Sequence, residues 1–179
     1  DNRGPLLRVV MGAQAKPGLV HRVPSLAAAG LGPADPIVFM PRIAQRPLDG
    51  HPQRSIYEPV APGDSYFPTP VYEAVALAYG HPQAGEIVWP EMQAVLALGG
   101  LDGLIGYPVV DNLTSARGQP FTGVVVQWEG DGVHDPLAIY VRREEVRYQY
   151  TCFFESFVRT GRATVLAPQR WADVRACPR

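Results

Sequence analysis

Glycine and proline interrupt this chain throughout its length, with 18 glycines and 19 prolines among 179 residues. Glycine lowers the stability of helices and strands, and proline lacks the backbone N–H that both need. Such a density excludes a long coiled coil or a helical bundle and favours short elements joined by turns. The length is typical of one domain that can bury an apolar core.

The charges nearly balance, since 16 lysines and arginines face 17 aspartates and glutamates and leave a net charge of −1. Nucleic-acid-binding proteins carry a clustered basic excess, so we expect no nucleic-acid partner. No apolar run reaches the roughly 20 residues that cross a bilayer, so we expect no transmembrane segment. No motif for a cofactor or a metal is present, and we expect neither.

The two cysteines, Cys152 and Cys177, form an even pair. In an exported protein such a pair predicts a disulfide, whereas two buried free thiols are the cytosolic alternative. The bond closes a loop of about 25 residues and stabilises the fold by about 3 kcal/mol in the chain-entropy description. The polar residues 1–5 match the start of a chain after signal-peptide removal, although a trimmed chain would look the same. We therefore expect a secreted or cell-surface protein.

Residues 1–69 have the pattern of an extended, proline-rich arm with short strands. Apolar stretches at 5–11, 18–23 and 36–44 are the candidate strands, and Pro41 marks the third as an edge strand. Prolines then recur from residue 41 to residue 70, which predicts an irregular connection. Four arm residues form a candidate assembly strand that would add to the sheet edge of a neighbour: Leu6, Leu7, Val9 and Val10.

Residues 70–179 have the pattern of an α+β core domain. Thr69 and Pro70 predict the start of a helix over 70–80, and a second helix over 90–98 ends at paired glycines. Strands are predicted where β-branched and aromatic residues gather, and we expect them to form an antiparallel sheet packed on the two short helices. These segments are 122–129, 137–142, 146–154 and 163–166. Residues 168–176 predict a short closing helix, held by the disulfide.

Residues 91–135 carry a series of short glycine, proline and aromatic signals. A helix precedes Gly99-Gly100-Leu101, Gly106-Tyr107-Pro108 follows, and a strand ends in Val126-Gln127-Trp128. This order resembles a repeat segment in secreted proteins of Chloroflexi and, more distantly, the LGFP repeats of actinobacterial wall-associated proteins. The resemblance implies a bacterial, envelope-associated module and brings no catalytic residues with it.

No residue pattern identifies a catalytic constellation. The four histidines lack metal-ligand spacing, and no serine has the context of an activated nucleophile. A secreted hydrolase would have to use distant carboxylates together with His134, and their spacing selects no pair. The available carboxylates are Glu73, Glu86, Glu91, Glu129, Asp131 and Asp135.

Aromatic side chains are the other candidate binding feature. Exposed tyrosine and tryptophan suit stacking on sugars or burial at a protein interface, whereas packing in the core is the alternative. The candidate binding residues are Tyr57, Tyr66, Trp89, Tyr107 and Trp128.

The sequence thus favours a non-enzymatic extracellular or cell-envelope protein. We expect it to act by self-assembly or by association with other surface proteins. Two alternatives stay open, a module that binds cell-wall polysaccharide and a secreted hydrolase.

Overall fold

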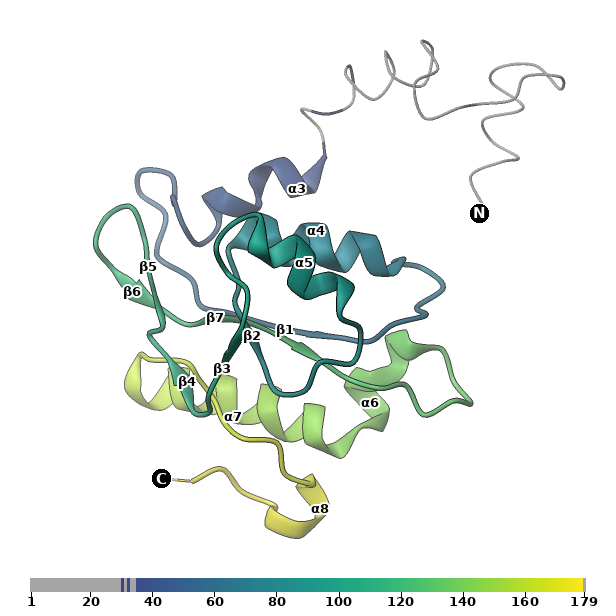
Figure 1. Ribbon diagram of the computed structural model, residues 1–179. Helices are drawn as coiled ribbons and strands as arrows, with labels where there is room; N and C mark the ends of the chain where they lie inside the picture. The colour runs from purple at the N-terminus through teal and green to yellow at the C-terminus, as the bar shows by residue number, and fades with distance from the viewer. Residues whose placement is uncertain (1–29, 31, 33–34, 179) are drawn as a thin grey trace, which may run out of the picture. The chain divides into compact units, whose positions relative to one another are not determined.

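Figure 1 shows the computed structural model of the protein, which describes residues 30, 32 and 35–178. The chain divides between Val38 and Phe39, and all the elements that matter below belong to the part from Phe39 onward. This division lies well before residue 70, where we expected the core domain to begin. The expected strands at 5–11 and 18–23, with the assembly strand of Leu6, Leu7, Val9 and Val10, lie outside the described residues.

The prediction of a strand over 36–44 was wrong. This segment forms helix α3 (Pro36–Phe39) and the 3-10 helix η2 (Met40–Arg42). Pro41 lies in the first turn of η2, where a residue without an N–H is tolerated because no intrahelical donor is needed there.

Within the described residues, the central sheet has four strands in the order β1-β7-β2-β3, and each pair of adjacent strands is parallel. The expected antiparallel sheet was therefore wrong. Helices separate β1, β2 and β3 along the chain, and such crossovers return each strand in the same direction. The strands are β1 (Ile56–Val60), β2 (Gln83–Ala84), β3 (Leu104–Ile105) and β7 (Gly123–Gln127).

Helices α4 (Thr69–Tyr79) and α5 (Glu91–Ala97) cover one face of the sheet and confirm the two predicted helices (Figure 1). Helix α4 ends at Gly80, whose φ of 70° is left-handed and favours glycine. Met92 and Leu96 of α5 are fully buried against the sheet. These helices form the α4–α5 layer.

Strand β7 confirms the strand predicted over 122–129 and is the centre of the molecule. Val124 and Val126 belong to the core cluster on one face of the sheet, and Val125 to the cluster under α4 and α5. All residues of β7 are buried. A continuous apolar run of this kind is typical of a parallel strand covered on both faces.

The strands predicted over 137–142 and 146–154 are helical, so these predictions were wrong. The segment forms η3 (Pro136–Ala138), α6 (Ile139–Arg142) and the long helix α7 (Glu144–Thr160) on the second face of the sheet (Figure 1). Buried positions in α7 recur every three or four residues, at Val146, Gln149 and Phe153. Glutamates occupy its first turn and Gly161 ends it, both of which are helix signals.

Antiparallel pairing occurs in two short ladders of the described chain. β4 (Val109–Val110) pairs with β8 (Thr164–Val165), and β5 (Leu113–Thr114) pairs with β6 (Pro120–Phe121). β8 confirms the strand expected near 163–166, and α8 (Trp171–Val174) confirms the closing helix. None of the helices in the described part of the chain is long and apolar enough to cross a membrane.

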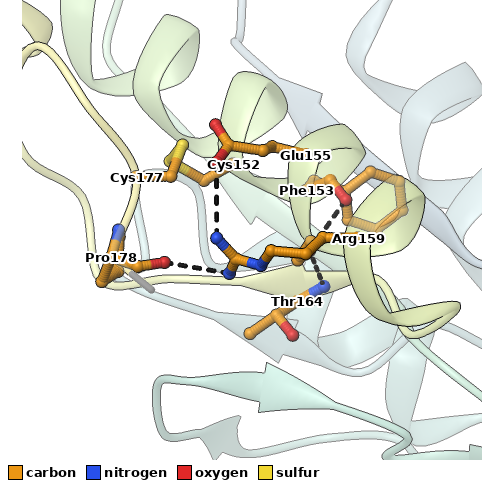
Figure 2. The surroundings of a disulfide bond; sticks show 8 residues. Cys152, Phe153, Glu155, Arg159, Thr164, Cys177 and Pro178 are labelled. Carbon is orange, nitrogen blue, oxygen red and sulfur yellow. Dashed lines mark hydrogen bonds and ion pairs between the residues drawn. A yellow bond between two sulfur atoms is a disulfide. The ribbon is translucent and has the colours of Figure 1, made fainter.

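Cys152 and Cys177 form the predicted disulfide, with a Cα–Cα distance of 5.4 Å. Figure 2 shows how the bond fastens the end of the chain to α7, which carries Cys152. Arg159 of the same helix adds a second contact, since its guanidinium donates to the backbone oxygen of Pro178 at 3.0 Å. Trp171 of α8 packs against Tyr148, with ring centroids 6.4 Å apart. The tail is thus held on α7 at several points.

Candidate functional site

The chain connections single out one edge of the parallel sheet. The connections that leave β1 and β2 run through the α4–α5 layer, whereas the connection that leaves β7 runs to α7 on the other face. β7 lies between β1 and β2 in the sheet. The chain therefore leaves the carboxyl end of β7 toward one face of the sheet, while it leaves the two neighbouring strands toward the other face. In open parallel sheets, ligands bind in the crevice that such a divergence opens.

A crevice of about 170 Å³ lies at this edge, and we call it the carboxyl-edge crevice. Residues at the end of β7, together with those that follow β2 and β7, form most of its wall. Residues from the β3–β4 loop, the start of α7 and the C-terminal tail complete it. The lining residues are Gly85, Glu86, Val88, Tyr107, Val126, Gln127, Trp128, Glu129, Arg143 and Pro168.

Gly85 lets the ring of Tyr107 lie close to the backbone after β2. Its φ of 83° is left-handed, and a Cβ atom at this position would come 3.0 Å from the Tyr107 hydroxyl oxygen. That hydroxyl and the indole Nε1 of Trp128 are buried without a hydrogen-bond partner among the described residues. Burial raises the pKa of Tyr107, and the neighbouring Gln149 side chain opposes part of this shift. The Tyr107 phenol therefore stays protonated.

Arg143 is fixed in the wall of the crevice by three contacts. Its guanidinium carbon lies 5.1 Å from the centroid of the Trp128 ring, an arrangement in which the cation is attracted by the aromatic face. Its Nη1 donates to the backbone oxygen of Glu129 at 2.6 Å, and its Nε lies 3.9 Å from a carboxylate oxygen of Glu145. The remaining guanidinium donors can serve a ligand.

Gln127 holds the β2–α5 loop beside the crevice. Its amide oxygen accepts the backbone N–H groups of Val88 and Trp89 at 2.6 and 3.0 Å, and its amide nitrogen donates to the Trp89 oxygen at 3.2 Å. Gln127 is itself buried. One buried side chain thus fixes the backbone of a lining segment.

The candidate aromatic residues occupy different environments. Tyr107 and Trp128 meet in the carboxyl-edge crevice, where Trp128 is 9% exposed and also belongs to the core cluster beside α7. Trp89 is 6% exposed and packs in the core under α4 and α5. Tyr66 is 74% exposed in the loop after β1. Tyr57 packs against the α7 core cluster and donates to the Gln149 amide oxygen at 2.7 Å. A binding role for these five residues stays a prediction.

A second feature is an exposed apolar surface, which the sequence analysis missed. We call it the α6–α7 surface, and it comprises the half-buried Tyr150 and five exposed residues, Tyr140, Val141, Phe154, Phe157 and Val158. Val158 is 85% exposed, Val141 81% and Phe154 62%. Apolar residues at positions 150, 154, 157 and 158 follow the helical period, so this outward stripe becomes visible once the segment is treated as a helix.

A groove of about 380 Å³ adjoins this stripe, between β1, α6 and α7. Apolar and aromatic side chains line it: Tyr57, Pro59, Tyr140, Val141, Tyr150, Phe153 and Phe154. The α6–α7 surface therefore combines exposed apolar side chains on α7 with a groove beside them. Contiguous exposed apolar area of this kind is typical of interaction sites.

A buried histidine and a glutamate form a hydrogen-bonded pair away from both features. His81 Nδ1 lies 3.0 Å from Glu58 Oε2, the His81 side chain is fully buried, and its ring stacks on Tyr79 with centroids 4.9 Å apart. The other ring nitrogen and the other carboxylate oxygen have no partner in the described structure. Gly123 makes room for the pair, because a Cβ there would come 2.9 Å from the imidazole.

The loop carboxylates considered for hydrolysis are held by hydrogen bonds. The backbone N–H of His134 donates to Asp131 at 2.8 Å and its ring Nδ1 lies 2.7 Å from the same carboxylate, which holds the Asp131 pKa below its usual range. Ser65 donates to Asp135 and likewise lowers its pKa. Among the described residues, no three His, Cys, Asp or Glu side chains gather as a metal site.

Comparisons with protein families, with curated proteins and with solved structures found no match to this chain. The resemblance of residues 91–135 to secreted repeat segments thus stays an expectation. The case for a function rests on the crevice and the α6–α7 surface.

Proposed function

We propose that the protein associates with a second copy of itself through the α6–α7 surface. The observation that carries this proposal is the exposure of large apolar side chains on one continuous face, with Val141, Phe154 and Val158 each more than half exposed. Burial of such groups is the main driving force of protein association, at roughly 25 cal/mol per Å² of apolar area.

A second copy suits this surface because the surface offers both exposed apolar side chains and an apolar groove that can receive them. A two-fold axis brings the same patch of both copies together, so one patch must supply both the protrusion and the cavity. In this arrangement the exposed side chains of α7 would enter the groove of the other copy.

The charges beside the stripe support the same arrangement. Glu155 and Arg159 are partly exposed and lie 3.4 Å apart on α7. An antiparallel pairing of two α7 helices centred on Phe157 would bring Glu155 of one copy opposite Arg159 of the other. Opposite charges at the rim of an interface favour one register over others.

The free edge of β1 is a weaker candidate for association. A second strand needs unpaired backbone donors and acceptors along the edge. Pro59 has no N–H to offer, and its backbone oxygen already accepts a hydrogen bond of 3.0 Å from the Tyr140 hydroxyl. Donation of the strand around Leu6 to Val10 to an edge elsewhere stays a prediction.

The disulfide supports a location outside the reducing cytosol, because such bonds persist in oxidising compartments. We therefore propose that self-association occurs at the cell surface or in the extracellular space. The hydrolase alternative has less support. Glu86 and Glu129 line one crevice, but both are exposed, and a general acid needs a more apolar setting.

The test is the solution mass measured by light scattering over a concentration series in non-reducing buffer. We expect the wild-type protein to dimerise as concentration rises and Val158→Lys to remain monomeric. Leu98→Lys is the matched control, because Leu98 is 81% exposed at the end of α5, outside the α6–α7 surface. A wild-type protein that is monomeric at every concentration would contradict the proposal.

A charge exchange tests whether the partner is a second copy in the antiparallel register. Arg159→Glu should weaken the dimer, since it sets like charges opposite one another across the interface. The double variant Glu155→Arg with Arg159→Glu should restore it, because both copies then carry the exchanged pair. If the double variant dimerises no better than the single one, the proposed register is wrong.

A further inference from the structure

We propose that the carboxyl-edge crevice binds one neutral sugar ring, as a site separate from the self-association surface. Three kinds of side chain line this crevice. They are the aromatic rings of Tyr107 and Trp128, the carboxylates of Glu86 and Glu129, and the guanidinium of Arg143. This inference stands on different residues from the proposed dimer, so either can fail without the other.

The volume of the crevice limits what it can hold. Its roughly 170 Å³ is below the ~300–1,000 Å³ of pockets that enclose drug-sized ligands. A single six-membered ring fits such a space, whereas an oligomer would have to extend into solvent. Two of the lining residues, Glu86 and Glu129, are exposed, so a chain attached to the bound ring can extend past them into solvent.

The lining offers both kinds of contact that a sugar needs. A pyranose ring has apolar C–H groups that pack on aromatic side chains, and hydroxyls that both donate and accept hydrogen bonds. Carboxylates accept from hydroxyls, and guanidinium donates to them, in charge-assisted bonds that are stronger than neutral ones. Glu86, Glu129 and Arg143 supply these two roles around the aromatic lining.

The balance of charge in the crevice argues against an ionic ligand. Two exposed carboxylates repel an anion such as a phosphate or a carboxylate. A cation would be drawn to the carboxylates, but Arg143 already lies over the Trp128 ring and would repel a second positive charge there. A neutral polyhydroxylated ring can hydrogen-bond to the carboxylates and to the guanidinium, and neither group repels it.

The site is organised before any ligand arrives. Arg143 is pinned to Trp128 and to the Glu129 backbone, and Gln127 fixes the segment that carries Val88. Pro168 belongs to the C-terminal tail that the disulfide fastens to α7. Pre-ordered walls lower the entropy lost on binding, which matters most for a small ligand.

The probes are methyl glycosides of glucose, galactose, mannose and N-acetylglucosamine, titrated into ¹⁵N-labelled protein. The three indole N–H signals of Trp89, Trp128 and Trp171 provide the readout by nuclear magnetic resonance, assigned by single Trp→Phe variants. We expect one or more glycosides to shift the Trp128 signal, with a dissociation constant of about 1 mM, and to leave the Trp171 signal in place.

Variants then locate the contact. Glu86→Gln and Glu129→Gln change exposed side chains, and each should weaken binding about tenfold, because a charge-assisted hydrogen bond becomes a neutral one. Asp102→Asn is the matched control, since Asp102 is exposed outside the crevice, and it should bind as the wild type does.

Three results would overturn the proposal. The first is that none of the four glycosides moves the Trp128 signal. The second is that both glutamine variants bind as tightly as Asp102→Asn. The third is that tetramethylammonium, titrated in parallel, shifts the Trp128 signal while the glycosides do not, which would make the crevice a cation site.

Discussion

The two layers that cover the sheet differ in the side chains they enclose and expose, although each buries polar groups, with Gln149 the buried amide of α7. The α4–α5 layer encloses polar groups, since His81, Gln83 and Gln127 are all buried on its side of the sheet. The α7 layer instead exposes apolar groups, with Phe157 and Val158 turned to solvent.

This difference separates structural residues from candidate contact residues. The buried glutamines are paired with backbone and with each other, as when Gln93 donates to Gln83 at 2.5 Å and accepts from the backbone of Gly103 at 2.7 Å. Paired polar groups inside a protein fix one arrangement of the loops they hold. Phe157 and Val158 of α7 are each more than half exposed, and a second surface would bury them.

The largest expected effect concerns the covalent bond on the α7 layer. Replacing both Cys152 and Cys177 with alanine should lower the free energy of unfolding by about 3 kcal/mol, because the unfolded chain regains the entropy of a loop of about 25 residues. Urea unfolding of the two proteins measures the difference. Adding a reductant should lower the urea midpoint of the wild-type protein and leave the midpoint of the alanine variant unchanged. Equal midpoints for all samples would show that the disulfide does not stabilise the fold.

A smaller loss is expected from the polar interior of the α4–α5 layer. Gln127→Ala should cost about 2 kcal/mol, since it leaves the N–H groups of Val88 and Trp89 without their acceptor. Gln119→Ala, at an exposed position, is the matched control and should stay within about 0.5 kcal/mol of the wild type in the same urea titration. If the two variants are equally stable, the hydrogen bonds of Gln127 do not stabilise the α4–α5 layer.

The smallest expected effect is a dependence on pH in the loop that joins β7 to α6. Hydrogen bonds hold the Asp131 pKa below its usual value of 3.8, so the ionised carboxylate stabilises the folded state. This contribution is present above the usual pKa and is lost as the pH falls below it.

Asp131→Asn removes the titrating group and keeps an oxygen that accepts from Val133 and His134. The thermal midpoint should therefore fall less in the variant than in the wild type between about pH 5 and pH 2. Asp135 titrates in both proteins and cancels from the comparison. Parallel midpoint curves would refute a role for Asp131.

Local signals in the sequence predicted some elements correctly and misread others. The helix over 70–80 was predicted because its boundaries are encoded by neighbouring residues, with Pro70 at its start and Gly80 at its end. Helix α7 was misread as strands because Val146, Tyr148 and Tyr150 alternate with polar residues and favour β structure. Residues 137–160 contain neither glycine nor proline, a signal of a long helix that deserved more weight.

The candidate sites were harder to predict because they depend on contacts distant in sequence. Tyr107 and Trp128 were candidates on residue type alone, but Gly85 and Arg143 joined them only through the packing of four separate segments. The α6–α7 surface requires knowing which side of α7 the sheet covers, and Phe153 and Phe154 differ in this respect despite being neighbours.

The sequence by itself determined the disulfide, the two helices of the α4–α5 layer and the central strand β7. Each of these depends on residue type, spacing or local capping, which act over a few positions or through a single covalent pair. The tertiary structure alone decided that the sheet is parallel, that β1 joins it at the edge and that two exposed features stand on its α7 side and at its carboxyl edge. These follow from how strands and helices bury one another's apolar faces, a property of the whole chain that no short segment encodes.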